Sequence, residues 1–257
     1  MQKSALKAKH LNLRLGNKTI LDDLSVCFRP NELTILLGPN GTGKSSLLKV
    51  ITHEWQAGGS VEYFGRCSSE WKGSILAKHL AVLPQSSNLT FNFTVREVVE
   101  LGGLTLNETQ KGIAKIATDN MRQTDIIHLA NRLYPSLSGG EKQRVHLARI
   151  LTQLAQGGDK RVMLLDEPTS SLDLSHQHQT LKLVKSLARE GASVIAVIHD
   201  LNLAAQYADR ILILNDGKLV ADGSPWETLT EQIISDVYQW PTQVIKHPKS
   251  GHPIILS

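Results

Sequence analysis

The stretch that decides the fold is LTILLGPNGTGKSS, which runs from Leu33 to Ser46. It begins with a short run of mostly apolar, branched residues, a pattern typical of a buried β-strand. It leads into SSLLKVI, from Ser45 to Ile51, which we interpret as a helix. The residues between them have the spacing G-x-x-x-x-G-K-S, the pattern of a P-loop. The sequence therefore predicts a strand, a glycine-rich turn and a helix, in that order.

This turn has the composition of a phosphate-binding loop. Its glycines let backbone N–H groups turn inward around phosphate oxygens, and the start of the following helix adds its positive dipole end. We expect Lys44 to reach the β- and γ-phosphates of a nucleotide and Ser45 to ligate Mg²⁺. A chance glycine-rich turn is the alternative, and the strand and helix on either side argue against it. The predicted nucleotide-binding residues are Gly38, Pro39, Asn40, Gly41, Thr42, Gly43, Lys44, Ser45 and Ser46.

A second element completes this chemistry. The run VMLLDE, from Val162 to Glu167, predicts a buried strand that ends in two carboxylates. The carboxyl ends of strands are where α/β sheets place their ligands. We therefore expect Asp166 to hold Mg²⁺ through water and Glu167 to act as the general base for an attacking water.

The rest of the chain alternates between strand-like and helix-like segments. Further apolar runs of strand length lie at 80–83, 194–198 and 211–214. The stretch from about Thr94 to Thr152 differs, because it opens with a capping box formed by Thr94 and Glu97 and stays helical. This alternation predicts an α/β fold with a mainly parallel sheet, interrupted by a helical insertion.

Composition narrows the possible functions. The chain has 257 residues, 41% of them hydrophobic, and a formal net charge of +4 that is spread without a long basic run. Scattered, solvated lysines explain that charge better than a nucleic-acid surface does, so we predict no nucleic-acid partner. Cys27 and Cys67 have no metal-ligand spacing and are interpreted as reduced thiols. No secretory signal and no run of membrane-spanning length is present, so any membrane role is expected to come through a partner.

One further motif points to a particular family. The run LSGGEKQ, from Leu137 to Gln143, resembles the signature of the ATP-binding subunits of ABC transporters, and the resemblance covers nearly the whole chain. A Ser-Gly-Gly turn that merely caps a helix would leave Glu141 to Arg144 unexplained. The resemblance implies that Ser138, Gly139 and Gly140 contact the γ-phosphate of a nucleotide held by a second copy of the chain.

Three more residues match the family in order along the chain. Gln85 resembles the Q-loop glutamine that senses Mg²⁺ and the attacking water, and Asp173 in the run SLD resembles the D-loop. His199 resembles the switch histidine that contacts the γ-phosphate. With Glu167, the resemblance thus implies three catalytic residues, and it adds Gln85 to Ser45 and Asp166 as the Mg²⁺ site. One departure is Leu15, before Gly16, where the family usually has an aromatic residue that stacks on adenine.

The resemblance also implies the architecture. It is a P-loop NTPase core of the RecA-like type with antiparallel N-terminal strands and a helical subdomain. We expect one ATPase domain over residues 1–240, with the core at about 1–87 and 159–240 and the helical subdomain at about 88–158. Residues 241–257 form a C-terminal tail to which the sequence assigns no structure.

A finer resemblance concerns the transported substrate. The stretches 89–95, 172–181 and 247–254 are similar to the ATP-binding subunits of bacterial haemin importers. This implies a homodimer on the cytoplasmic side of the inner membrane, bound to two permease subunits and served by a periplasmic substrate-binding protein. We do not expect His176 and His178 to ligate haem together, because residues two apart on a helix point in different directions.

Other functions stay open at this point. Ferric-siderophore and cobalamin importers share most of this architecture. A soluble ABC-type ATPase that acts on nucleic acid or ribosomes usually has two cassettes or a long coiled-coil insertion, and this chain has neither. A regulatory module that binds nucleotide without hydrolysis is disfavoured, because Glu167 and His199 are both present.

Overall fold

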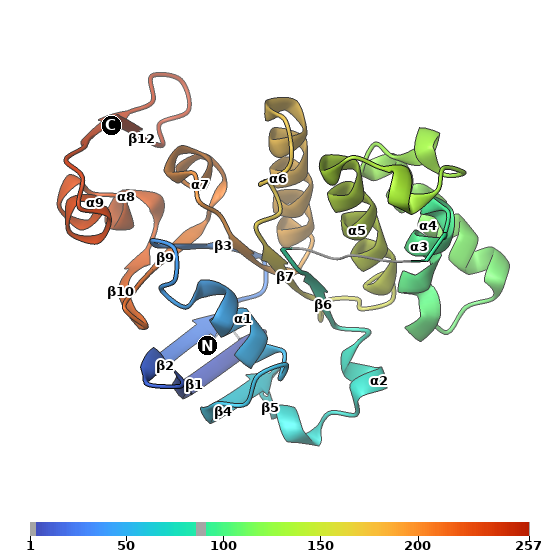
Figure 1. The fold of residues 1–257 in the computed structure, drawn as a ribbon, viewed down its shortest axis with the longest axis horizontal. Helices are drawn as coiled ribbons and strands as arrows, with labels where there is room; N and C mark the ends of the chain where they lie inside the picture. Colours follow the sequence, from blue (N-terminus) through green and yellow to red (C-terminus); the bar gives the residue numbers. More distant parts are fainter. Residues whose placement is uncertain (1–3, 86–90, 257) are drawn as a thin grey trace.

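The structure is a computed structural model, and it describes residues 4–85 and 91–256. The described residues form two larger β-sheets and a two-stranded sheet near the C-terminus, with helices packed on the larger sheets and a group of helices to one side (Figure 1). The strands are β1 (Leu6–Leu15), β2 (Lys18–Phe28), β3 (Glu32–Leu37), β4 (Gly58–Tyr63), β5 (Arg66–Cys67), β6 (Leu80–Leu83), β7 (Val162–Asp166), β8 (Ser193–Val197), β9 (Arg210–Asn215), β10 (Lys218–Gly223), β11 (Gln243–Lys246) and β12 (Pro253–Leu256).

The α-helices are α1 (Lys44–Ile51), α2 (Gly73–Leu76), α3 (Val95–Glu100), α4 (Gln110–Gln123), α5 (Gly139–Gln153), α6 (Leu174–Arg189), α7 (Leu201–Tyr207), α8 (Pro225–Thr228) and α9 (Glu231–Tyr238). Short 3₁₀ helices are η1 (Ser68–Glu70), η2 (Leu101–Thr105), η3 (Ile127–Leu129) and η4 (Tyr134–Ser136).

The central sheet has the strand order β10-β9-β3-β8-β7-β6. All neighbouring strands in it run parallel except β9 and β10. The five apolar runs that predict strands each overlap one of its strands, so the mainly parallel α/β sheet is confirmed. Because β3, β6, β7 and β8 are parallel, the residues that follow them lie at one edge of the sheet. The P-loop, Gln85, Glu167 and His199 follow these strands.

A second sheet, of order β2-β1-β4-β5, is antiparallel and confirms the predicted N-terminal strands. Helix α1 lies between the two sheets (Figure 1). Its Leu47 and Ile51 are fully buried in one apolar cluster with Leu21 of β2 and Leu36 of β3. The two sheets therefore enclose the helix that follows the P-loop.

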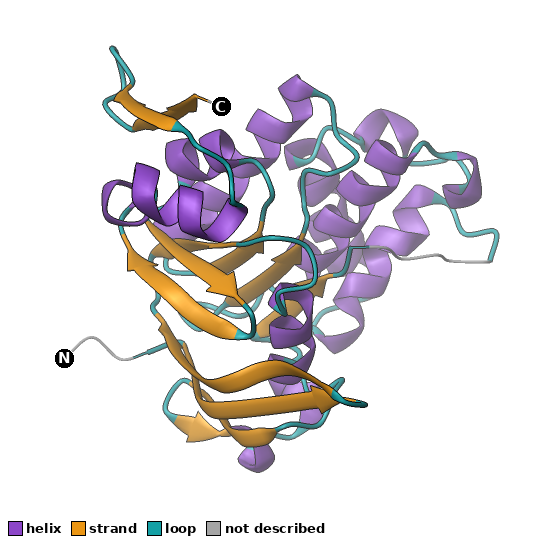
Figure 2. Cartoon of the chain, turned by 60° about the vertical axis from the view of Figure 1, so that its left-hand side comes forward, coloured by secondary structure: helices purple, strands orange, loops and turns teal. Residues whose placement is uncertain are grey.

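The other face of the central sheet is covered by helices (Figure 2). One apolar cluster joins the sheet to Leu147 of α5, Val184 of α6, Ala204 of α7 and Ile234 of α9. Helix α5 also contributes Val145 to a separate cluster with α3 and α4. It thus belongs to both the core and the helical part.

Helix α3 begins with the capping box that the sequence predicts. Thr94 caps α3, and Glu97 bonds back to the backbone N–H of Thr94 at 2.7 Å, which completes the capping box. In residues 4–85 and 91–256, no helix is long and apolar enough to span a bilayer.

The C-terminal tail is structured. Strands β11 and β12 form an antiparallel hairpin. Asn202 on α7 exchanges two hydrogen bonds with the backbone of Ile255, at 2.8 and 3.1 Å, and the Ile255 side chain is buried in the main core cluster. The Trp226 indole donates to the carbonyl oxygen of Gly251 at 3.0 Å. The hairpin is therefore held against the core through strand β12 and through the turn.

Candidate functional site

The loop between β3 and α1 depends on glycine at two positions. Gly38 has φ 138°, and a Cβ atom there would lie 2.0 Å from the carbonyl oxygen of Leu214. Gly43 has φ 104°, and its Cβ would lie 2.8 Å from the carbonyl oxygen of Ile20. Any other residue would strain the backbone and collide with a neighbouring chain segment. The loop conformation is thus tied to strands β2 and β9.

Lys44 is buried at the start of α1. Its ammonium group donates to the carbonyl oxygens of Gly38 at 2.7 Å and Pro39 at 2.8 Å. Burial lowers the pKa of Lys44, and the nearby carboxylates of Glu167 and Asp166 oppose that shift. Gly43 supplies no side-chain cap for α1, so the first N–H groups of the helix are left for another acceptor. A buried cation beside free helix N–H groups suits an anionic ligand.

Ser45 and Asp166 meet at the mouth of this loop. The Ser45 hydroxyl donates to the Asp166 carboxylate, with 3.1 Å between Oγ and Oδ1. Burial raises the pKa of Asp166, and the hydrogen bond from Ser45 opposes the shift. A hydroxyl and a carboxylate oxygen are ligands that Mg²⁺ prefers, and a cation between them would offset the burial of the charge. These two residues fit a Mg²⁺ site.

Glu167 and His199 lie within hydrogen-bond distance of each other beside it. The Glu167 Oε1 atom lies 2.7 Å from the His199 Nε2 atom. Both residues follow neighbouring parallel strands, because Asp166 of β7 pairs in register with Val197 of β8. A carboxylate held by an imidazole at the edge of the sheet is a suitable acceptor for a water proton.

These groups face one cavity of about 380 Å³. The residues that line it come from β2, from the P-loop and from the segments that follow β6, β7 and β8. Its lining residues are Lys18, Ile20, Asn40, Gly41, Gly43, Lys44, Ser45, Ser46, Gln85, Glu167 and His199. Gln85 is the last described residue before the gap at 86–90, so the start of the predicted haemin-importer stretch 89–95 lies outside the described residues.

The predicted signature residues lie elsewhere. Ser138 is the N-cap of α5, where its hydroxyl accepts from the Glu141 N–H and its own N–H donates to the Glu141 carboxylate. Gly140 lies so close to Ser171 that a Cβ atom would come within 2.7 Å of the Ser171 carbonyl oxygen. Ser138, Gly139 and Gly140 do not line the P-loop cavity.

Asp173 caps a different helix. Its carboxylate accepts from the backbone N–H of His176 at 2.9 Å at the start of α6, and the His176 imidazole lies 2.9 Å away. The backbone hydrogen bond, followed by the imidazole contact, holds the pKa of Asp173 below its usual range. The predicted D-loop therefore ends in a fixed helix cap next to Ser171 and the signature turn.

Comparison with known families agrees with this geometry. The sequence profile of the ABC transporter family matches residues 21–170. The chain belongs to the ABC transporter family. As a member of this family, it is an ATPase, and the predicted P-loop NTPase fold is confirmed.

Several relatives are similar over nearly their whole length. The chain is 54% identical to the hemin import ATP-binding protein of Photobacterium damsela subsp. piscicida, with 98% of this chain and 96% of that protein covered. It is 56% identical to the protein of that name from Photobacterium profundum, with coverage of 100% and 92%. It is 50% identical to the one from Vibrio cholerae, with coverage of 99% and 99%.

Solved structures share the fold. A metal-chelate type ABC transporter in an inward-facing conformation superposes with a TM-score of 0.81 at 24% identity, covering 100% of this chain and 97% of that one. An ATP-binding cassette solved as a dimer after hydrolysis, bound to ADP and phosphate, gives a TM-score of 0.75 at 25% identity, with coverage of 85% and 98%.

The structure brings most of the predicted ABC residues together at one cavity. The signature residues with Asp173, and Leu15, lie outside it. The P-loop, Gln85, Glu167 and His199 line one cavity, and Asp166 bonds to Ser45 beside them. The signature residues and Asp173 form a second cluster through Ser171. Leu15 does not line the cavity; it lies at the end of β1 with 46% of its surface exposed. Its contact with adenine stays a prediction.

Sequence reasoning missed three contributors to the ABC site. Lys18 and Ile20 line the cavity from β2, and no motif marks them. Tyr238, at the end of α9, accepts a hydrogen bond at 3.0 Å from the backbone N–H of Gly38, two hundred residues away. Burial raises the pKa of Tyr238 to about 12. Only a tertiary structure reveals such a contact.

The two histidines of α6 point to different partners, as predicted. His176 contacts Asp173, and the His178 imidazole lies 2.8 Å from the Tyr207 hydroxyl. Among the described residues, no group of three or more His, Cys, Asp or Glu side chains is arranged to hold a metal ion.

Proposed function

We propose that this chain is the ATP-hydrolysing subunit of a haemin importer. The observation that carries this proposal is the identity of 50–56% to hemin import ATP-binding proteins of Photobacterium and Vibrio over nearly their full length. The three stretches noted in the sequence as similar to haemin importers agree with it.

The residues of the cavity have separate roles in hydrolysis. The P-loop N–H groups and Lys44 bind the β- and γ-phosphates of ATP. Ser45, Asp166 and Gln85 would hold Mg²⁺, which would offset the negative charge that develops on the phosphate during hydrolysis. Glu167 takes a proton from the attacking water, whose oxygen bonds to the γ-phosphorus as ADP leaves. His199 orients Glu167 and contacts the γ-phosphate.

A second copy of the chain completes each site. Ser138, Gly139 and Gly140 do not line the chain's own cavity, and they place small residues at a helix start, which suits the γ-phosphate of a partner's ATP. Two chains about a two-fold axis join each P-loop to the other's signature turn. The related cassette solved as a dimer with ADP and phosphate supports this arrangement.

The membrane partners bind the helical part. Large apolar side chains are exposed there, with Phe91 at 67%, Leu104 at 79% and Leu133 at 48% of their surface. We propose that these side chains belong to the surface that the permease subunits cover. We place the dimer at the cytoplasmic face of the inner membrane, on two permease subunits that receive haemin from a periplasmic binding protein.

Complementation tests the substrate. The chain is expressed in a Vibrio cholerae strain that lacks its own hemin import ATP-binding protein and that is given haemin as its only iron source. We expect growth with the wild-type chain and none with the Glu167→Gln variant. Two parallel cultures test the alternatives, each in a strain that lacks the ATPase of the importer concerned. One receives a ferric siderophore as its iron source, and the other depends on cobalamin uptake. Rescue confined to either of these would replace haemin with that substrate class.

A further inference from the structure

A side chain on the signature helix contacts the backbone of Glu167. The Gln143 amide, in the second turn of α5, donates to the Glu167 carbonyl oxygen with 2.6 Å between Nε2 and O. The bond is partly buried and joins residues 24 apart in the sequence. Gln143 thus connects the helix that begins with the signature to the residue after β7.

The Glu167 backbone needs such support. Its φ of 52° lies in the left-handed region, which is unfavourable for a residue with a side chain. Its carbonyl oxygen also accepts from the Ser170 N–H at 3.3 Å and the Ser170 hydroxyl at 3.2 Å, and its N–H donates to the Val197 carbonyl oxygen at 3.2 Å. The Gln143 bond is the shortest of these and the only one of them that comes from α5.

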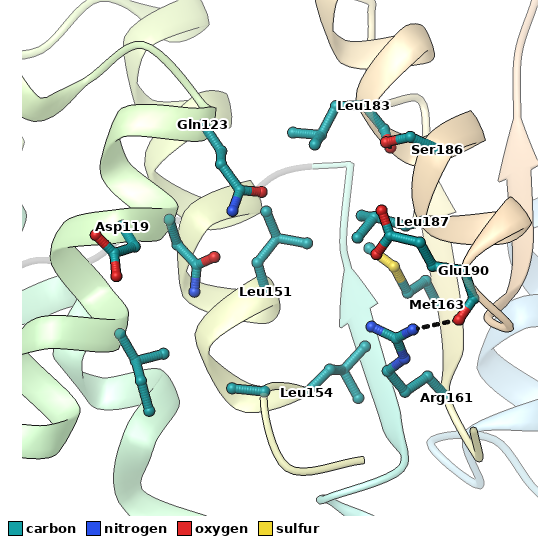
Figure 3. A pocket seen from close by; sticks show the side chains of 13 residues that line it. Asp119, Gln123, Leu151, Leu154, Arg161, Met163, Leu183, Ser186, Leu187 and Glu190 are labelled. Atoms are coloured by element: carbon teal, nitrogen blue, oxygen red, sulfur yellow. Dashed lines mark hydrogen bonds between the residues drawn. The ribbon is translucent and has the colours of Figure 1, made fainter. Parts of the chain in front are cut away.

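A second contact reinforces the first. Gly140 packs against the Ser171 carbonyl oxygen, so the start of α5 lies on the segment that follows Glu167. Further along α5 the contact opens. A cavity of about 310 Å³ lies between two groups of residues (Figure 3). On one side are Leu151 of α5 and Leu154 just after it, and on the other are Leu183 of α6 and Glu190 just after that helix. The Gln143 and Gly140 contacts with the segment that follows β7 both lie in the first two turns of α5.

We propose that Gln143 is a positioning residue that holds the Glu167 backbone in the orientation required for hydrolysis. Gln143 thereby links the first turns of the signature helix to the chain's own general base. This inference rests on the proposed two-chain ATPase. It deepens that function by giving a positioning role to a residue that does not line the P-loop cavity.

Substitution of two glutamines on the same helix separates this role from simple stability. Gln143→Met keeps the length of the side chain and removes the donor. Gln153→Met is the matched control, because Gln153 also donates from α5 to core carbonyl oxygens, those of Ala77 at 2.8 Å and Leu80 at 3.1 Å. We expect Gln143→Met to lower kcat by about tenfold or more, with KM for ATP nearly unchanged, since a small displacement of a catalytic group is costly. Gln153→Met should keep the wild-type kcat.

Thermal denaturation of both variants shows whether either has lost its fold. Gln143→Glu provides the same comparison if Gln143→Met does not fold, because it also replaces the donor and keeps the side-chain length. Equal kcat values for the folded Gln143 and Gln153 variants would overturn the proposal.

A mixed dimer of two different variants shows which of the two chains needs Gln143 for hydrolysis. One chain carries Lys44→Ala and supplies the intact signature, and the other carries Ser138→Arg and supplies the intact P-loop and Glu167. Gln143→Met is then added to one chain or the other. Our proposal predicts a loss of rate when it is in the Ser138→Arg chain and little loss in the Lys44→Ala chain. The reverse pattern would mean that Gln143 only shapes the signature. A pair without ATPase activity before Gln143 is changed would count against the proposed dimer, and the single variants would then decide the role of Gln143.

Discussion

The Nε2 atom of His199 lies 2.7 Å from the Oε1 atom of Glu167. The two residues come from the ends of adjacent parallel strands, and Glu167 reaches His199 from a left-handed backbone conformation. The imidazole therefore limits the directions in which the carboxylate can point. In our proposal Glu167 is the general base, and this contact would direct its carboxylate toward the attacking water.

Removal of the imidazole should slow hydrolysis. We expect His199→Ala to lower kcat for ATP by about 100-fold, because Glu167 loses the group that orients it and a misplaced catalytic group costs about that much. Phosphate release in the steady state measures it. His178→Ala is the matched control, because His178 also bonds to a single neighbour, Tyr207, and does not line the cavity. Similar rates for both variants would remove His199 from the mechanism.

The site that binds adenine can be tested at Leu15. An aromatic ring there should stack on the base and tighten ATP binding by about fivefold, or ~1 kcal/mol, at the lower end of base–aromatic stacking. Calorimetric titration of Leu15→Tyr measures the change. Val220→Tyr, on a similarly exposed side chain of β10, is the control. If Leu15→Tyr binds ATP no more tightly than the control, another residue covers adenine, and Lys18 and Ile20 become the candidates.

Tyr238 should support the P-loop from the C-terminal part of the chain. Tyr238→Phe leaves the Gly38 N–H without its hydroxyl acceptor, which costs roughly 1–3 kcal/mol for a buried donor. We expect a lower melting temperature and a higher KM for ATP. Tyr207→Phe, which loses its hydroxyl contact with His178, serves as the control for stability alone. An unchanged KM in Tyr238→Phe would show that the loop keeps its shape without this contact.

Stability should fall in acid because of a buried histidine. His146 lies in α5, 4% exposed, with its Nε2 atom 2.7 Å from the Tyr134 hydroxyl. Burial, and to a lesser extent the positive charge of Arg149, lowers the pKa of His146 to about 4. The unfolded chain, with a usual histidine pKa of about 6.5, binds the proton more readily. The contribution of His146 is therefore fully present above about pH 6.5 and is lost as the pH falls toward 4.

The loss between about pH 7.5 and pH 5 should be about 2 kcal/mol in the free energy of unfolding. Denaturant unfolding at both pH values measures it. His146→Gln should show a smaller difference between the two pH values, and His128→Gln, at an exposed site on η3, should match the wild type. Equal pH dependence in all three proteins would contradict the assignment to His146.

The sequence predicts this fold well where chemistry is local. The P-loop, the strand before Glu167 and the capping box of α3 each consist of neighbouring residues whose pattern determines their structure. The contacts that join distant segments were not predicted. Gln143 was visible in the signature, but its bond to Glu167 depends on how α5 packs. No local pattern marks Tyr238 as a partner of the P-loop, because its bond to Gly38 joins two ends of the chain. The hairpin of β11 and β12 likewise depends on its packing against α7 and the core.

The most direct test of the composite ATPase is the state of Glu167→Gln with ATP and Mg²⁺. The amide keeps the shape of the side chain but cannot accept the water proton, so ATP should bind, bridge two chains and remain intact. Light scattering coupled to size exclusion should show a dimer that depends on ATP, with phosphate release at least about 100-fold slower than in the wild type. Phosphate release near the wild-type rate, or a variant that stays monomeric when saturated with ATP, would contradict the account.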